Sequence, residues 1–218
     1  MSRRILALFA KAPVAGQVKT RLAPELSLAS AALLYEAMLL DILDQHAAER
    51  DCAHALWFAP AEAADWFARS APSGWRLLPQ NGRDLPARMA RLFAVHAAED
   101  FDRIVLRGTD SPTLPVARVR EAFEALEHSE LVLCPDRDGG YNLIGLRGAC
   151  DALFDLELSH AGVLAQTLDR ARALGLRAEL LPAHHDVDTF ADLVRLGPEL
   201  DPRLTPRTSR LYRSLLSP

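Results

Sequence analysis

Three cations within eleven residues, Lys11, Lys19 and Arg21, are the first sign of chemistry in this chain. They lie in the segment FAKAPVAGQVKTRL, which follows an apolar run, contains Gly16 and precedes a helical pattern. A strand, a flexible cationic loop and a helix form an arrangement that binds phosphates, because loop N–H groups and long cationic side chains converge on one anion. The segment therefore predicts a site for a nucleotide or another polyphosphate.

A second candidate is Asp110, in the segment RGTDSPTL that follows the apolar run 103–106. In open α/β sheets the ligand crevice lies at the carboxyl ends of the strands. A carboxylate there is suited to Mg²⁺ or Mn²⁺, which take oxygen ligands and bridge phosphates. The alternative is that Asp110 only shapes a turn leading into a helix. We expect Asp110 to be catalytic and a metal ligand.

The segment CPDRDGGYNL contains a third candidate site. Asp138-Gly139 between two strand-like runs is a strong hairpin signal, and a hairpin alone would explain it. The functional interpretation is an acceptor-binding loop in which Asp138 also serves as a general base. The acceptor-binding residues would be Asp136, Gly139, Gly140, Tyr141 and Asn142.

The segment HHDVDTFAD contains alternating carboxylates after the last predicted strand. Thr189 and Asp192 have capping-box spacing, so helix initiation would explain that pair. Asp186 or Asp188 would complete a metal site begun by Asp110, and Asp188 is our choice for the second ligand. The adjacent histidines 184 and 185 are a candidate for a softer metal, but neighbours in an extended chain project to opposite sides, so we expect surface residues.

The segment QNGRDLPARM is a loop that enters a helix. Gln80, Arg83 and Arg88 are within reach of a base, ribose or phosphate if this loop borders the crevice. A solvated helix start is the equally supported alternative. We include Gln80 and Arg83 in the predicted nucleotide-binding set.

Apolar runs of strand length alternate with helical periodicity, which indicates a three-layer α/β/α fold with a mostly parallel, Rossmann-like sheet. The predicted strands are 5–10, 55–59, 75–78, 103–106, 131–134, 142–146 and 177–181. The predicted helices are 28–49, 61–69, 84–98, 115–127, 162–174 and 189–196. We expect one domain over 1–197, with 198–218 as an irregular strap of the same domain that ends in a short amphipathic piece, 209–216.

The whole chain has 218 residues, a formal charge of −4 and half of its residues hydrophobic, which fits a globular enzyme. No global basic field draws it to nucleic acid, so an anion site must be local. The longest apolar runs are far shorter than the roughly 18 residues of a membrane span. Three cysteines without metal-type spacing are read as reduced thiols of a cytoplasmic protein. A homodimer is compatible with the sequence.

Four ordered segments, FAKAPVAGQVKTRL, RGTDSPTLP, CPDRDGGYNLIGL and DVDTFADL, resemble a bacterial family of uncharacterised transferases over residues 4–196. That family has the glycosyltransferase-A, or nucleotide-diphospho-sugar transferase, fold, and its members are commonly described as glycosyltransferases of arsenosugar biosynthesis. The resemblance implies a phosphate loop at Lys11, Lys19 and Arg21, and a metal aspartate at Asp110. It also implies an acceptor loop at 138–141 and a closing motif at 186–189.

Two departures from the family pattern fall on the expected acceptor side. Asn142 stands where a second aromatic residue usually follows Tyr141, and LSHA at 158–161 replaces a Trp-Ser/Thr-Thr segment, with His160 unexpected. More distantly, the sequence is similar to phospholactate and phosphoenolpyruvate guanylyltransferases, which share the Lys-Thr-Arg-Leu loop, a strand-end Asp-x-Pro and a closing Asp-x-Asp-Thr. The two groups catalyse different reactions on one fold.

Two enzymatic hypotheses follow, both with Mg²⁺ or Mn²⁺ as cofactor. The first is glycosyl transfer from a nucleotide-diphospho-sugar to a small-molecule acceptor, as the family description implies. The second is nucleotidylyl transfer, in which a phosphorylated small molecule attacks an NTP and pyrophosphate leaves. Three cations suit a triphosphate better than a diphosphate, and a lone strand-end aspartate favours the same hypothesis. A non-catalytic nucleotide-binding module is the third hypothesis, against which the presence of Asp110 and Asp188 argues.

Overall fold

The computed structural model describes residues 3–23, 25–155 and 162–216, and all seven predicted strands are present in it. The strands are β1 (Arg4–Lys11), β2 (Ala53–Ala59), β3 (Arg76–Pro79), β4 (Arg103–Arg107), β5 (Leu131–Pro135), β6 (Tyr141–Leu146) and β7 (Ala178–Leu180). They form one sheet in the order β3-β2-β1-β4-β6-β5-β7. Among the strands of the described residues, only β6 runs against its neighbours, so the predicted mostly parallel sheet is confirmed.

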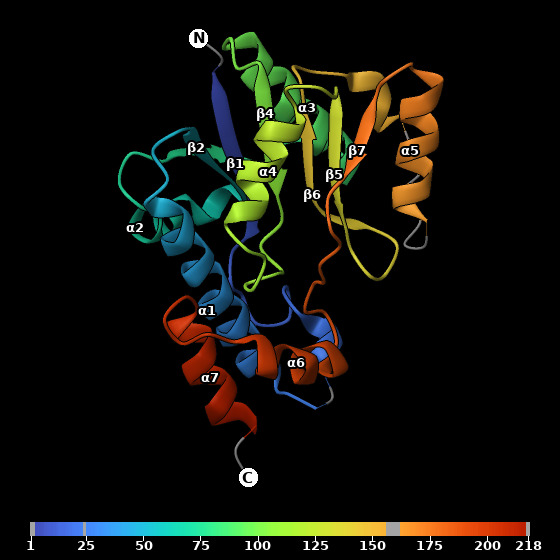
Figure 1. Cartoon of the computed structure of the whole chain (residues 1–218). Helices are drawn as coiled ribbons and strands as arrows, with labels where there is room; N and C mark the ends of the chain where they lie inside the picture. Colours follow the sequence, from blue (N-terminus) through green and yellow to red (C-terminus); the bar gives the residue numbers. More distant parts are fainter. Residues whose placement is uncertain (1–2, 24, 156–161, 217–218) are drawn as a thin grey trace.

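Helices cover both faces of the sheet, which confirms the three-layer prediction (Figure 1). Alternate residues of β1 point to opposite faces, as the period of a strand requires. Leu6 and Leu8 belong to a core shared with α1 (Leu28–Ala47), α2 (Ala64–Ser70) and α4 (Ala117–Ala125). Ile5 and Ala7 belong to a second core shared with α3 (Leu85–Ala98), the 3-10 helix η3 (Asp151–Phe154) and α5 (Val163–Ala173).

A third apolar cluster lies beyond the carboxyl ends of the parallel strands, in the lower part of Figure 1. It joins the 3-10 helix η1 (Thr20–Leu22) to α1, α6 (Phe190–Leu196) and α7 (Pro206–Leu216). Leu22, Met38 and Leu193 are fully buried there. This cluster fixes both the cationic loop and the segment before α6 beneath the strand ends.

The predicted helices are present with small changes at their ends, and the tail differs from its prediction. Residues 61–69 begin as the 3-10 helix η2 (Ala61–Ala63) and continue as α2, and α4 is two residues shorter than expected at each end. The tail is more regular than the expected strap: η4 (Gly197–Glu199) follows α6, and α7 starts at Pro206. Proline is favoured in a first helical turn, so this proline starts the helix rather than preventing it. Leu211 and Tyr212 pack α7 into the third cluster.

The strand order places the ligand crevice between β1 and β4. The chain moves outward from β1 to β2 and β3, and then returns to β4 on the other side of β1. Such a reversal is the point at which open α/β sheets bind ligands. The cationic loop leaves β1 and Asp110 follows β4, so the two strongest sequence candidates meet at this point.

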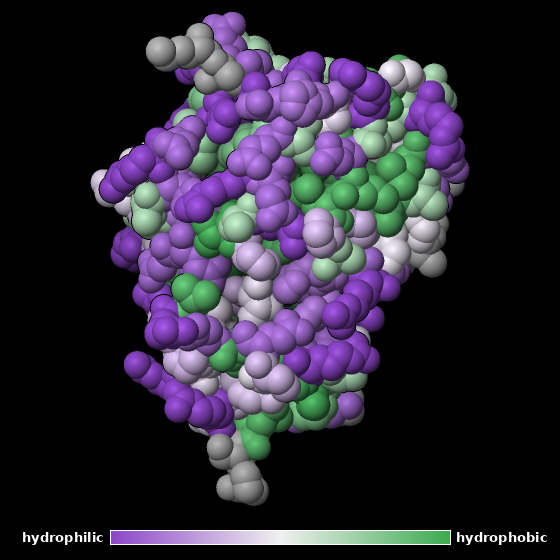
Figure 2. Space-filling view, in the orientation of Figure 1, coloured by the Kyte–Doolittle hydropathy of each residue, from purple (hydrophilic) through white to green (hydrophobic). Residues whose placement is uncertain are grey.

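The face of the molecule drawn in Figure 2 is mostly hydrophilic, with an apolar area over the edge strand β7. Leu180 on that strand is 49 % exposed. Within the described residues, no helix combines the length and the hydrophobicity that crossing a bilayer demands.

Candidate functional site

A cavity of about 860 Å³ opens at the carboxyl ends of β1 and β4. That volume lies within the range of small-molecule and cofactor sites, roughly 300–1,000 Å³. Most predicted site residues line it: Lys11, Lys19, Arg21, Gln80, Arg83, Asp110, Asp136, Asp138, Gly140, Tyr141, Asn142 and Asp188. Gly16 and Gly139 shape their turns with positive φ but do not line the cavity.

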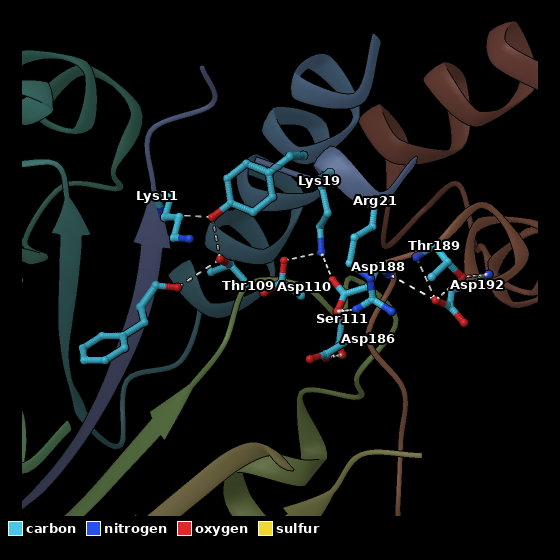
Figure 3. Close-up of polar contacts among 12 residues, drawn as sticks. Lys11, Lys19, Arg21, Thr109, Asp110, Ser111, Asp186, Asp188, Thr189 and Asp192 are labelled. Carbon is cyan, nitrogen blue, oxygen red and sulfur yellow. Dashed lines mark hydrogen bonds and ion pairs between the residues drawn. The ribbon is translucent and has the colours of Figure 1, made fainter. Parts of the chain in front are cut away.

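The ammonium group of Lys19 lies between the two predicted metal ligands (Figure 3). Its Nζ pairs with Asp110 Oδ1 and is 3.0 Å from Asp188 Oδ1. The Lys19 side chain is 4 % exposed, whereas Arg21, which reaches Asp188 at 3.4 Å, is 66 % exposed. Of these two cations, Lys19 is therefore shielded from water and Arg21 is not.

Two further properties show how firmly Lys19 is held. Burial, the largest single influence, lowers the pKa of Lys19, but the Asp110 and Asp188 carboxylates outweigh it and raise the pKa above its ordinary value. Its backbone is left-handed, with φ of 48°, at the residue that caps η1. A non-glycine residue in that region is strained, and such strain clusters at functional sites. Lys19 is therefore a fixed positive charge in the cavity.

A second pair of carboxylates, Asp136 and Asp186, borders the same cavity. The backbone N–H of Asp186 donates to Asp136 Oδ1 at 3.1 Å, and Ser111 Oγ lies within hydrogen-bond distance of Asp186 Oδ1. Burial and the neighbouring Asp110 raise the pKa of Asp186. Burial and a hydrogen bond with Asp138 raise the pKa of Asp136. Sequence reasoning preferred Asp188 to Asp186, since alternation along the chain does not reveal which carboxylate faces other carboxylates.

The donor set fits Mg²⁺ or Mn²⁺. Six aspartates line the cavity, and four of them, Asp110, Asp136, Asp186 and Asp188, form the candidate donor set. Oxygen is the ligand that these hard cations prefer. Burial is the main cause of the raised pKa of Asp186, and the negative charges of Asp110 and Asp136 each act on it more strongly than the positive charge of Lys19. A divalent cation with phosphate ligands would complete that balance, so metal dependence stays a prediction that the residues support.

A chain of hydroxyl groups connects the cationic loop to the Asp110 loop (Figure 3). The Lys11 backbone N–H donates to Tyr35 Oη at 3.0 Å. Thr109 Oγ1 donates to Phe9 O at 3.0 Å, so Tyr35 Oη donates in turn to Thr109 Oγ1 at 2.9 Å. Burial and the nearby Asp110 raise the pKa of Tyr35 to about 12, which keeps its proton in place. The network fixes Asp110 relative to the end of β1.

The residues expected to contact the nucleotide base or ribose have less freedom than the sequence suggested. The Gln80 amide donates to Ala10 O and Trp57 O at 3.1 and 2.9 Å, so it joins backbone segments. Arg83 is exposed and pairs with Asp84, whose carboxylate caps α3. Gln80 therefore supports the wall of the cavity through its donors, while Arg83 remains able to move toward an anion.

The β5–β6 connection is the predicted hairpin, and it presents one buried amide to the cavity. Asp138 Oδ1 accepts a hydrogen bond from Gly140 N at 3.1 Å, so this carboxylate stabilises the turn. Asn142 is buried and lines the cavity, yet its amide oxygen and nitrogen have no hydrogen-bond partner among the described residues. Buried polar groups are nearly always paired, so Asn142 is available to a ligand.

Beneath the Asp110 loop, Arg107 is fully buried. It donates to His46 Nε2 at 2.6 Å and to Ser111 O at 2.5 Å, which braces the turn that carries Asp110. Since a guanidinium only donates, His46 Nε2 must be the unprotonated acceptor. Burial and, second, the charge of Arg107 lower the pKa of His46 to about 2.

We expect this histidine to make the fold sensitive to mild acid. As the pH falls below 6.5, the unfolded chain protonates His46 while the folded chain does not, so unfolding becomes more favourable. At pH 5 this contribution is about 2 kcal/mol. The measurement is urea unfolding of wild type and His46→Gln, whose amide oxygen still accepts from Arg107. Between pH 7 and pH 5, the free energy of unfolding of wild type should fall by about 2 kcal/mol more than that of His46→Gln.

The comparison with His46→Gln is needed because other groups titrate in the same range. The raised pKa values of Asp136 and Asp186 favour the folded state as the pH falls, but they are common to both proteins. Equal losses of stability in wild type and His46→Gln would show that His46 is not held neutral.

The expectation that His184 and His185 are surface residues is wrong. His185 is buried and His184 is half-buried, and their ring centroids lie 4.8 Å apart at an interplanar angle of 32°. His184 pairs with Asp136 in an isolated parallel bridge, yet the two neighbouring rings lie close together, so the opposite projection expected from the sequence does not describe this pair. Residues 158–161, including the unexpected His160, lie outside the described residues.

Comparisons with known proteins agree with this fold. The chain is 34% identical over 188 residues to 3-phospho-D-glycerate guanylyltransferase of Phenylobacterium zucineum, covering 82% of this chain and 84% of that protein. It is 28% identical over 179 residues to 2-phospho-L-lactate guanylyltransferase of Methanothermobacter thermautotrophicus, covering 80% and 76%. A crystal structure from Desulfovibrio desulfuricans G20, provisionally described as a nucleotide-diphospho-sugar transferase, superimposes with a TM-score of 0.88 at 30% identity and covers 99% of both chains.

These similarities establish a nucleotide-diphospho-sugar transferase-like fold and a nucleotide-using transferase. Both guanylyltransferases are nucleotidylyltransferases, so they support the second sequence hypothesis better than the first. Residues 42–159, more than half of the chain, match a family without an assigned activity. The chain belongs to this family, which is described as "Uncharacterized protein conserved in bacteria (DUF2064)".

Proposed function

We propose that this protein is a nucleotidylyltransferase that joins a nucleoside triphosphate to a phosphorylated small molecule and releases pyrophosphate. The observation that carries the proposal is the buried Lys19 ammonium beside Asp110 and Asp188, in a cationic loop at the strand ends. The two guanylyltransferase relatives support the same reaction, so GTP is the first nucleotide to test. A phosphorylated hydroxy acid is the first acceptor to test, since both relatives are named for one.

In this reaction an oxygen of the acceptor phosphate attacks the α-phosphorus of the triphosphate. A new P–O bond forms, the bond from the α-phosphorus to the bridging oxygen breaks, and pyrophosphate leaves with the electron pair. Lys11, Lys19 and Arg21 line the side of the cavity where they can stabilise the charge that develops on pyrophosphate. Asp110 and Asp188 would hold a Mg²⁺ or Mn²⁺, which supplies further positive charge to the phosphates.

The acceptor side of the cavity needs no general base for this chemistry. A phosphate monoester has a second pKa near about 6, so it is already an anionic nucleophile at neutral pH. Asp138, which is hydrogen-bonded to Gly140 N, then serves the turn rather than proton transfer. The unpaired Asn142 amide can donate to a carboxylate or phosphate oxygen of the acceptor and fix its orientation.

Glycosyl transfer is the second candidate, and one observation favours it. The Desulfovibrio desulfuricans structure that matches along 99% of both chains is described in terms of nucleotide-diphospho-sugars. An acceptor hydroxyl would then need to lose a proton, and Asp138 or Asp136 would have to accept it. The two reactions release different products, so one assay separates them.

The test is to incubate the full chain with Mg²⁺ or Mn²⁺, each of the four NTPs, and a panel of phosphorylated hydroxy acids. We expect pyrophosphate release that requires the acceptor phosphate, with a product whose mass equals the acceptor plus a nucleoside monophosphate. The matched control is each acceptor without its phosphate, which should give no product. Release of a nucleoside diphosphate from a nucleotide-sugar would support glycosyl transfer instead, and nucleotide binding without any turnover would indicate a binding module.

A further inference from the structure

A cluster of histidine and carboxylate side chains lies outside the nucleotide cavity. His184 and His185 follow β7, and Glu199 is the last residue of η4. One ligand atom from each of the three residues lies within 4.8 Å of the others. None of the three lines the cavity at the strand ends. The cluster is therefore separate from the four aspartates of the proposed active site.

His185 points into this cluster without a hydrogen-bond partner. Its side chain is 5 % exposed, and neither ring nitrogen is hydrogen-bonded within the described parts of the chain. Its Nε2 lies 3.5 Å from Glu199 Oε2, in a geometry that makes no hydrogen bond. Buried polar groups in folded proteins are nearly always paired, so an unpaired buried imidazole calls for a ligand.

Thr113 connects the other two members of the cluster. Its hydroxyl donates to Glu199 Oε2 at 3.3 Å and lies 3.1 Å from His184 Nε2. The two imidazole rings lie side by side, with centroids 4.8 Å apart. Two imidazoles and a carboxylate thus face one small volume next to a hydroxyl group.

We propose that His184, His185 and Glu199 bind a divalent transition-metal ion of the zinc class. Two nitrogen donors and one carboxylate oxygen are a ligand set that Zn²⁺ accepts, whereas Mg²⁺ and Ca²⁺ prefer oxygen ligands alone. Ligand bonds of about 2.0–2.2 Å require the donor atoms to draw closer than 4.8 Å. Glu199, which is 38 % exposed, has the freedom to move inward. Water would fill the fourth position.

The ion would connect two segments, 184–185 and η4, and the first of them is hydrogen-bonded to the loop that carries Asp110. Ser111 donates to the backbone oxygen of His185 at 2.7 Å, and Val187 N donates to Asp110 O at 2.9 Å. A metal on His184 and His185 would join this paired backbone to η4 through Glu199. Its role is structural, and it does not depend on which reaction the nucleotide cavity supports.

The test uses the full chain without a polyhistidine tag, stripped of metal by a chelator and free of nucleotide. Titration with Co²⁺ should give a visible absorption band that saturates at one ion per chain, and Zn²⁺ should displace Co²⁺ whereas Mg²⁺ should not. Zn²⁺ should also raise the thermal unfolding temperature. Glu199→Gln and His184→Gln should each weaken Zn²⁺ binding at least about 10-fold.

Two control variants make the outcome decisive. Glu179→Gln, on the exposed strand β7, and Asp110→Asn, in the nucleotide cavity, should both bind Zn²⁺ with wild-type affinity. The proposal fails if wild type does not bind one Co²⁺ per chain, or if both cluster variants bind Zn²⁺ as tightly as wild type. It also fails if Asp110→Asn abolishes binding, which would place the ion among the aspartates. Should one cluster variant not fold by circular dichroism, the other decides.

Discussion

Replacing Asp110 with asparagine should lower turnover at least about 10³-fold while the protein stays folded. The Asp110 carboxylate pairs with Lys19 and lies close enough to Asp186 to raise its pKa, so it is central to the charge balance of the cavity. Asparagine has nearly the same shape but cannot supply the anionic oxygen that a divalent cation needs. The measurement is the rate of pyrophosphate release with GTP, acceptor and Mg²⁺, alongside thermal unfolding.

The stability of this variant should change by no more than about 1 kcal/mol. The Asp110 side chain is 40 % exposed, Lys19 keeps Asp188 at 3.0 Å, and the hydrogen bond to the Asp110 backbone oxygen is unaffected. The matched control is Asp169→Asn, a carboxylate on α5 that is 73 % exposed and lies outside the cavity. Turnover of Asp110→Asn close to that of the control would show that the cavity's chemistry does not depend on Asp110.

The centre of the sheet could be predicted from sequence because its strands are buried on both faces. β1 and β4 appear in the sequence as continuous apolar runs, which is how strands covered by helices on two sides are recognised. The capping box of Thr189 and Asp192 starts α6 where the spacing predicts it. The tail was harder, since its prolines suggest irregular chain. What makes α7 a helix is packing against α1 and α6, which no local pattern reveals.

The part of the candidate site that follows directly from the ends of the strands could be predicted from sequence. Lys19 and Asp110 each follow a strand that ends at the switch point, so their meeting follows from the topology. The roles of Arg107 and His46 were not predictable, because these residues meet under the loop from segments 61 positions apart. The burial of His185 was missed for a related reason: its segment packs against the Asp110 loop, where Ser111, 74 positions away, donates to the His185 backbone oxygen.

Lys19→Met should be the most damaging change in the cationic loop, with kcat/KM for the nucleotide reduced by about 10³-fold. The methionine fills a similar volume but leaves Asp110 and Asp188 without the buried charge that they share. Those carboxylates, with Asp186 nearby, would then repel the triphosphate, so both KM and kcat should worsen. Removal of the charge should also destabilise the fold by about 1–3 kcal/mol at neutral pH, after allowance for the partial exposure of both carboxylates.

The matched comparison is Arg21→Met, which removes a cation two residues away in the same loop. Arg21 contacts Asp188 at 3.4 Å, but its side chain is 66 % exposed, so water and salt screen its charge. We expect kcat/KM to fall less than about 10-fold in this variant. The kcat/KM of wild type should also depend more strongly on ionic strength than that of Arg21→Met. Equal losses in the two variants would contradict the special role of the buried cation.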